Sequence, residues 1–123
     1  MSGEIVNLML TLRNQVKIYH WETMKYARHK ATDDLVDKLD DAIDKFVEVY
    51  IGKYGRPKLT PRTGTIRLRN YDDVQAPTLL NEAIAWMTNR LPALLSKNDT
   101  DLLNIRDEIL AELNQTLYLF TLQ

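Results

Sequence analysis

Apolar residues recur every three or four positions along most of this chain, which is the repeat of an amphipathic helix. The first apolar stripe predicts a helix over about residues 3–27 and consists of Ile5, Met9, Leu12, Val16 and Tyr19. Its unbroken spacing indicates one face buried against other helices.

A second stripe predicts a helix over about residues 32–52. Thr32 is a suitable cap, and Asp33 and Asp34 suit the positive end of the helix dipole. Gly52 marks the end of the helix. The expected core face of this helix consists of Leu35, Leu39, Ala42, Ile43, Phe46 and Tyr50.

Two further helices are predicted over about residues 77–95 and 99–121. Pro77 is acceptable in a first helical turn, whereas Pro92 removes a backbone donor and should interrupt the third helix. The expected buried residues of these two helices are Leu80, Ile84, Met87, Leu91, Leu102, Ile105, Ile109, Leu113, Leu117 and Phe120.

The segment 53–76 contains Pro57, Pro61 and Gly64 and only a short strand-like patch at 65–68. A connection this long lets the chain travel a full helix length and restart from the same end, which makes the second and third helices parallel. We therefore expect an all-α fold, a ferritin-like four-helix bundle with a long crossover, formed as a single domain by residues 1–123. A simple up-and-down bundle would use a short loop there.

Composition narrows the functional classes. The chain has 123 residues and no Cys, which excludes disulfides, thiolate metal sites and a cysteine nucleophile. The first ten residues lack a basic cluster and no apolar run is long enough to span a membrane, so we expect a cytoplasmic protein without a membrane segment.

Charge is distributed unevenly although the net charge is only −1. Residues 31–51 carry a net charge of −5, and residues 53–69 carry +6 without any acid. The basic segment is a candidate contact for nucleic acid or another partner, or alternatively a solvated loop or a segment packed on the acidic helix. Its cations are Lys53, Arg56, Lys58, Arg62, Arg67 and Arg69.

Two histidines and three acids are candidate metal ligands. Asp44 and Glu48 are four residues apart and share one helix face, where they can bind or bridge a metal. Imidazole and carboxylate together suit ferrous iron. Each residue alone also has a structural explanation, since an acidic stripe is usually a solvated face and a lone histidine is usually a packing residue. The candidates are His20, His29, Asp33, Asp44 and Glu48, with Trp21 as a neighbour.

The combination resembles the Dps family of mini-ferritins. In that family a His-Trp pair is followed by a second His, an Asp four residues later, and a D-x-x-x-E pair. Here the pattern is His20-Trp21, then His29 and Asp33, then Asp44 and Glu48, with the His20 to His29 gap about three residues shorter than usual. The motif covers about a quarter of the chain.

Helix geometry adds a constraint of its own. With a turn near residue 28, His20 is level with about residue 36, and Asp44 and Glu48 lie roughly 12 Å and roughly 18 Å further along the axis. One subunit therefore cannot close the site, but a two-fold partner can supply the acids.

The resemblance implies a dinuclear iron site shared between subunits, at which Fe(II) is oxidised by peroxide or dioxygen and stored as Fe(III). It implies that His20 and the partner's Asp44 and Glu48 bind the first iron, and that His29 and Asp33 help to hold the second. It also implies a two-fold dimer as the unit of a twelve-subunit shell, about 172 kDa for a 14.3 kDa chain. The first twelve residues contain no Lys or Arg, whereas several Dps proteins hold DNA through a Lys-rich N-terminal arm. This difference argues against direct DNA binding.

Three classes of function follow from the sequence. The first is a ferroxidase and iron store. The second is a non-catalytic helical bundle that binds a partner. The third is a nucleic-acid binder that uses residues 53–69.

Overall fold

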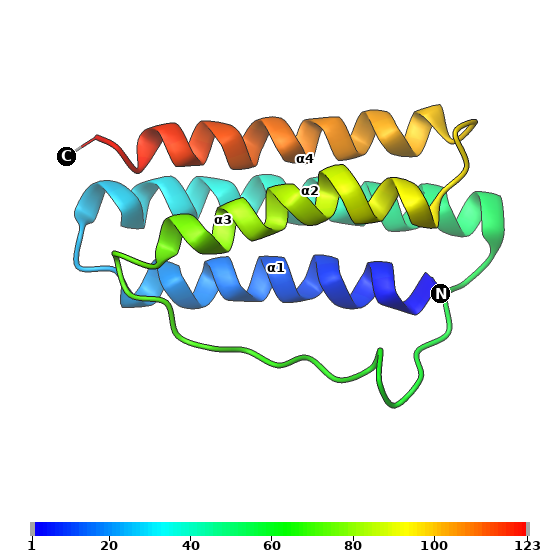
Figure 1. Ribbon diagram of the computed structural model, residues 1–123, viewed down its shortest axis with the longest axis horizontal. Coiled ribbons are helices and arrows are strands. Elements are labelled where there is room, and N and C mark those ends of the chain that lie inside the picture. Colours follow the sequence, from blue (N-terminus) through cyan, green and yellow to red (C-terminus); the bar gives the residue numbers. More distant parts are fainter. Residues whose placement is uncertain (1, 123) are drawn as a thin grey trace.

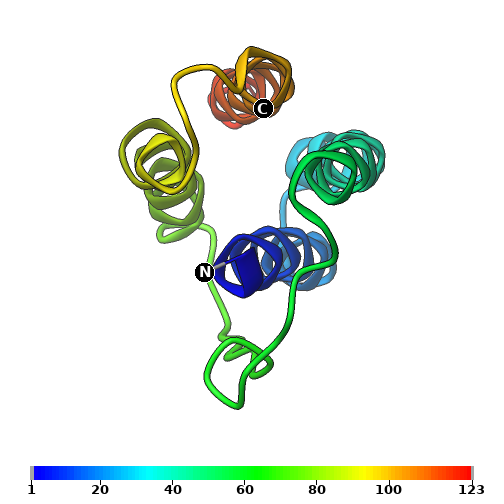
Figure 2. The same cartoon turned by 90° about the vertical axis from the view of Figure 1, so that its right-hand side faces the viewer.

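The computed structural model describes residues 2–122 and contains four helices and no β-strand among those residues. The helices are α1 (Ser2–Glu22), α2 (Tyr26–Tyr54), α3 (Ala76–Ala85) and α4 (Thr100–Leu119), and α3 is continued by η1 (Trp86–Arg90) and η2 (Leu91–Leu94) (Figure 1). Viewed end-on, they occupy the corners of a square with α1 diagonal to α4 (Figure 2). The predicted all-helical bundle is confirmed.

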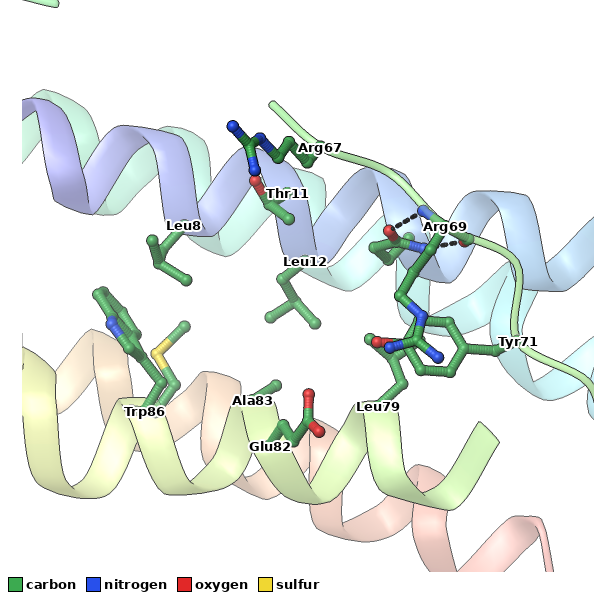
Figure 3. A pocket seen from close by; sticks show the side chains of 12 residues that line it. Leu8, Thr11, Leu12, Arg67, Arg69, Tyr71, Leu79, Glu82, Ala83 and Trp86 are labelled. Carbon is green, nitrogen blue, oxygen red and sulfur yellow. Dashed lines mark hydrogen bonds between the residues drawn. The ribbon is translucent and has the colours of Figure 1, made fainter. Parts of the chain in front are cut away.

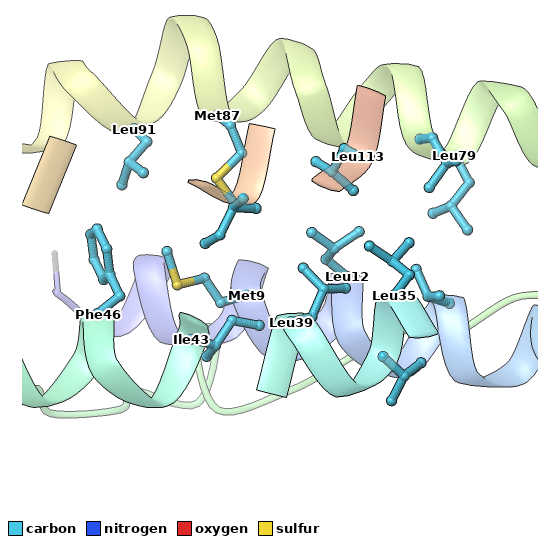
Figure 4. Packing of buried hydrophobic residues seen from close by; sticks show 14 of the residues in the cluster. Met9, Leu12, Leu35, Leu39, Ile43, Phe46, Leu79, Met87, Leu91 and Leu113 are labelled. Carbon is cyan, nitrogen blue, oxygen red and sulfur yellow. The ribbon is translucent and has the colours of Figure 1, made fainter. Parts of the chain in front are cut away.

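The apolar stripes of the helices meet in the centre of this square (Figure 4). Met9, Leu39, Phe46, Leu91 and Leu113 are completely covered, at 0% exposure. Burying a side chain of this size contributes about 1.5–3 kcal/mol. These stripes therefore fix the positions of the helices.

The turn between α1 and α2 lies at residues 23–25, not near residue 28. The carboxylate of Asp73 accepts hydrogen bonds from Thr23 Oγ1 at 2.6 Å and from the backbone N–H of Met24 at 3.2 Å. Thr32, expected to cap the second helix, instead lies inside α2, where its hydroxyl donates to the carbonyl of Arg28 at 2.7 Å. The first helix is thus shorter than expected, and the second begins six residues earlier.

Residues 55–75 return along the outside of α1, so α3 starts near the end of the bundle where α2 starts (Figure 1). Side chains of α1 hold this connection at intervals. Asn7 Nδ2 donates to the carbonyls of Thr63 and Thr65, both at 2.7 Å. The amide of Gln15 pairs with both the N–H and the carbonyl of Arg69, each at 2.7 Å. The strand-like patch expected at 65–68 is part of this connection and has no strand partner.

Gly3 is required by the close approach of this connection to α1. A Cβ atom at Gly3 would lie 2.7 Å from Thr63 Oγ1 and 2.8 Å from the carbonyl of Lys58. Any larger residue would therefore push the connection away from the helix.

The third helix is interrupted at Pro92, as predicted. The N–H of Leu91 bonds to the carbonyl of Trp86, five residues earlier, and the N–H of Leu95 bonds to the carbonyl of Pro92, three residues earlier. The missing donor of Pro92 accounts for this change of hydrogen-bond pattern. No helix within residues 2–122 is long and apolar enough to cross a membrane.

Candidate metal centre

Two histidines meet where α1 ends and α2 begins. The rings of His20 and His29 stack with their centroids 3.9 Å apart and their planes 17° apart. His20 Nδ1 lies 2.8 Å from the carbonyl oxygen of His29, and His29 Nδ1 lies 2.9 Å from the carbonyl oxygen of His20. Each ring is therefore held by the backbone of the other histidine.

These contacts determine which ring nitrogen is free. A carbonyl oxygen only accepts, so Nδ1 carries the proton in both rings and Nε2 of each neutral imidazole keeps its lone pair. In the described part of the chain, Arg28 Nε is the one fully buried side-chain polar atom without a partner. His20 Nε2 makes no hydrogen bond, so it must reach the surface although His20 as a whole is only 6% exposed. Metal-binding histidines are commonly oriented in this way.

A buried arginine, Arg28, precedes His29 at the start of α2. Arg28 Nη1 donates to Tyr19 Oη at 3.0 Å and to the carbonyl of Asp73. Its guanidinium lies 4.6 Å from the ring centre of Phe120 at the end of α4. Arg28 thus ties α1, α2, α4 and the connection together at this end of the bundle.

The groups around Arg28 have shifted pKa values. Burial raises the pKa of Tyr19. Burial also opposes ionisation of Asp73, but the hydrogen bonds from Thr23 and Tyr19 outweigh it and lower its pKa. An ionised Asp73 therefore holds the turn beside the histidines.

The sequence predicted a turn near residue 28, which was wrong. Arg28 and His29 both lie in α2, and Arg28 is 7% exposed. A signal was present, because Arg28 precedes Leu35 and Leu39 by seven and eleven residues and so shares their helix face.

The three candidate acids all lie on the exposed side of α2. Asp33, Asp44 and Glu48 are turned by about 40°, 60° and 100° around the helix axis from His29, at 100° per residue. None of the three has an ion-pair partner within the part of the chain described. They are therefore accessible and uncompensated.

The acids are far from the histidines along α2. At 1.5 Å per residue, Asp44 lies roughly 22 Å and Glu48 roughly 28 Å beyond His29. The sequence predicted that Asp44 and Glu48 lie only roughly 12 Å and roughly 18 Å from the level of His20. These axial separations were too small because the turn lies earlier in the chain. Accordingly, no three candidate ligands come together anywhere in residues 2–122. A metal site that uses both sets needs two chains.

Trp21 points away from the core. It is 67% exposed, and Lys17 Nζ lies 5.2 Å from its ring centre. Leu10 is also exposed on α1, at 41%. The face of α1 that carries Trp21 and Leu10 therefore lies outside the core.

The basic connection is only partly available to a partner. Lys53 Nζ lies 2.7 Å from carboxylate oxygens of both Asp99 and Asp101. The hydrogen bond from Lys53, and to a smaller extent that from the hydroxyl of Tyr54, lowers the pKa of Asp99 to about 2. The connection lies along α1 and not on the acidic helix. The cations that remain exposed on it are Arg56, Lys58, Arg62, Arg67 and Arg69.

Fold and geometry thus define a small helical bundle with a candidate transition-metal centre at one end. By sequence, the chain belongs to a family of unknown function (DUF5856), which matches residues 20–120. A stretch of 60 residues is 43% identical to an uncharacterized 14.6 kDa protein of the mobD-ri intergenic region of Enterobacteria phage T4. The aligned stretch covers 49% of this chain and 46% of that relative, so it spans less than half of either. No solved structure matches the chain.

Proposed function

We propose that this protein is a Dps-like member of the ferritin-like superfamily that binds Fe(II) between two subunits and oxidises it. The observation that carries the proposal is the histidine pair, in which Nδ1 of His20 and of His29 is bonded to backbone and Nε2 of each is left without a partner. Such preoriented imidazoles fit ferrous iron when carboxylates complete the site.

The donor sets on one chain complement those on a second chain. Nε2 of His20 is a nitrogen donor at one end of α2, and Asp44 and Glu48 are uncompensated oxygen donors further along. A two-fold partner with its α2 antiparallel brings its acids to this chain's histidine and receives the reverse contact. Each dimer then has two equivalent sites, with His29 and Asp33 beside each for a second iron.

The crossover supports the assignment to the ferritin-like superfamily. The connection spans the bundle along α1, and α2 and α3 start at the same end (Figure 1). This order of helices is the one expected of a ferritin-like bundle with one long crossover.

The proposed reaction is a two-electron reduction of the oxidant. Two Fe(II) ions each lose one electron, and hydrogen peroxide takes up both electrons and two protons to give two molecules of water. The carboxylates bind the hard Fe(III) product as it forms, since oxygen ligands suit it. Fe(III) then leaves the site for storage within a closed oligomer.

The proposal is tested by titrating Fe(II) into the protein without oxygen and following heat, and then by adding peroxide and following ferric absorbance. We expect Glu48→Gln to abolish tight binding and rapid oxidation. Asp34→Asn is the matched control, because Asp34 is exposed on the same helix and is not among the proposed ligands, so the substitution removes the same charge without removing a donor.

Two results would contradict the proposal. One is a wild-type chain, folded and oligomeric, that does not bind Fe(II). The other is equal loss of binding in the Glu48 and Asp34 variants, which would indicate general charge attraction. The first result would leave the non-catalytic bundle as the better hypothesis, and salt-sensitive DNA retention that requires Arg67 would favour the nucleic-acid binder.

A further inference from the structure

A cavity of about 270 Å³ lies between α1, α3 and the connection, along the bundle from the histidine pair (Figure 3). Most of its wall is apolar and comes from the two helices. The apolar wall consists of Leu8, Leu12, Leu79, Ala83, Trp86 and Met87. One enclosed water needs only about 10–15 Å³ of volume of this kind, so the cavity has ample room for the apolar body of a small molecule.

Two arginines form the side of the cavity that faces solvent. Arg67 and Arg69 are two residues apart in an extended segment, so their side chains project to the same side of it. Neither has a carboxylate partner within the described chain. The guanidinium of Arg69 lies 4.6 Å from the ring centre of Tyr71.

The backbone that carries the arginines is fixed. Gln15 bonds to both the N–H and the carbonyl of Arg69, and these two bonds are visible beside the cavity (Figure 3). One acid, Glu82 of α3, lies across the cavity from Arg69. Two cations against one anion leave the cavity mouth with a net positive charge.

We propose that this cavity binds a small amphipathic carboxylate. The apolar body lies between α1 and α3, and the carboxylate lies at the mouth against Arg67 and Arg69. Guanidinium groups bind carboxylates through paired charge-assisted hydrogen bonds, and an apolar wall with a few convergent polar groups is typical of small-molecule sites. The site uses none of the proposed iron ligands, so it is independent of iron binding.

The test uses octanoate, a small carboxylate with an unbranched apolar chain, with octanol and octylamine as neutral and cationic analogues of equal chain length. Binding is followed by calorimetry into the millimolar range. It is also followed by the fluorescence of Trp86 in a Trp21→Phe background, which leaves Trp86 as the sole indole. We expect octanoate to bind and both analogues to bind at least about tenfold more weakly, because a hydrogen bond to a charged group is lost.

Substitutions at the mouth test the direction of the charge effect. We expect Arg67→Gln with Arg69→Gln to weaken octanoate binding tenfold or more, and Glu82→Gln to strengthen it. Arg56→Gln with Lys58→Gln is the matched control, because both side chains are exposed on the same connection, neither lines the cavity, and the pair of substitutions removes the same charge. Circular dichroism of each variant checks that the bundle is intact.

The proposal is overturned if octanoate gives neither heat nor a Trp86 response, or if octanol binds as tightly as octanoate. Weaker binding in Glu82→Gln would also overturn it, since the ligand would then need a cationic group. Equal effects of the Arg67/Arg69 double variant and of its control double variant would mean that octanoate responds to overall charge and not to this cavity.

Discussion

Mixing two inactive variants tests whether the iron site is shared between subunits. One variant is His20→Asn, in which the amide nitrogen can replace Nδ1 as a donor to the carbonyl of His29 while no atom replaces Nε2. The other is Glu48→Gln, which keeps the shape of an exposed side chain and removes its charge. Each homodimer lacks one donor at both of its sites.

Symmetry sets the size of the expected recovery. A mixed dimer has one site with both substitutions and one site with neither. Equal amounts of the two chains, assembled at random, form mixed dimers in about half of all cases and so restore about one quarter of the wild-type sites. The number of tight Fe(II) sites per chain, measured without oxygen by calorimetry, should therefore recover to about one quarter of the wild-type number.

If the two variants are co-expressed with different affinity tags, purification on both tags in turn isolates the mixed dimers. These dimers should contain about half of the wild-type number of sites. Mass spectrometry of the intact complex establishes that mixed dimers have formed. If they have formed and bind no iron, the shared site is refuted. Iron binding by either homodimer alone would equally refute the assigned ligands.

Two further predictions concern the bundle itself. The pKa of Asp99 is lowered to about 2 from 3.8, so its ion pair with Lys53 stabilises the fold above about pH 4 and is lost as the pH falls toward 2. Asp99→Asn should therefore lower the free energy of unfolding in urea by at most about 2 kcal/mol at pH 7, and its difference from wild type should shrink in acid. Gly3→Ala adds a Cβ that meets Thr63, so it should lower the free energy of unfolding by about 1–3 kcal/mol. Gly52→Ala has open space around it inside α2 and should raise the free energy of unfolding by about 0.5–1 kcal/mol. A lower melting temperature for both variants would contradict this reasoning.

Helical periodicity predicted the core because each buried stripe is a local pattern. Met9 and Leu39 were both expected on core faces and are both completely buried. The interruption at Pro92 was also predictable, since a missing N–H acts within one helical turn. What sequence reasoning misplaced was the first turn. Its position depends on Asp73, which is about 50 residues away from Thr23 in the chain and offers no local signal.

The candidate site was predictable as a set of residues but not as an arrangement. The spacing of His20 and His29 did not reveal that their rings stack, because stacking requires the turn to lie at residues 23–25. Thr32 was taken for a helix cap since it precedes two acids. Its hydroxyl instead bonds back to the carbonyl of Arg28, a choice that depends on burial and not on sequence order.

The proposed site restricts how two chains can pair. For the histidine pair of one chain to meet Asp44 and Glu48 of the other, the two-fold axis must cross α2 about midway between them, near Asp37. At this level α1 provides Arg13, whose Nε lies 2.8 Å from Asp40 Oδ1. The connection is bonded to the side of α1 that carries Asn7 and Gln15, whereas the side that carries Leu10 and Trp21 is open to solvent.

Exposed Leu10 lies on this open side of α1, close to the level of Arg13. If two copies meet there, each contributes apolar Leu10 and the cation Arg13 as well as the acids of α2. The acids of one copy therefore do not face acids alone. An axis near Asp37 also sets Asp37 against its own copy, and like charges in contact disfavour association, so Arg13 is the cation that offsets the acids at this level.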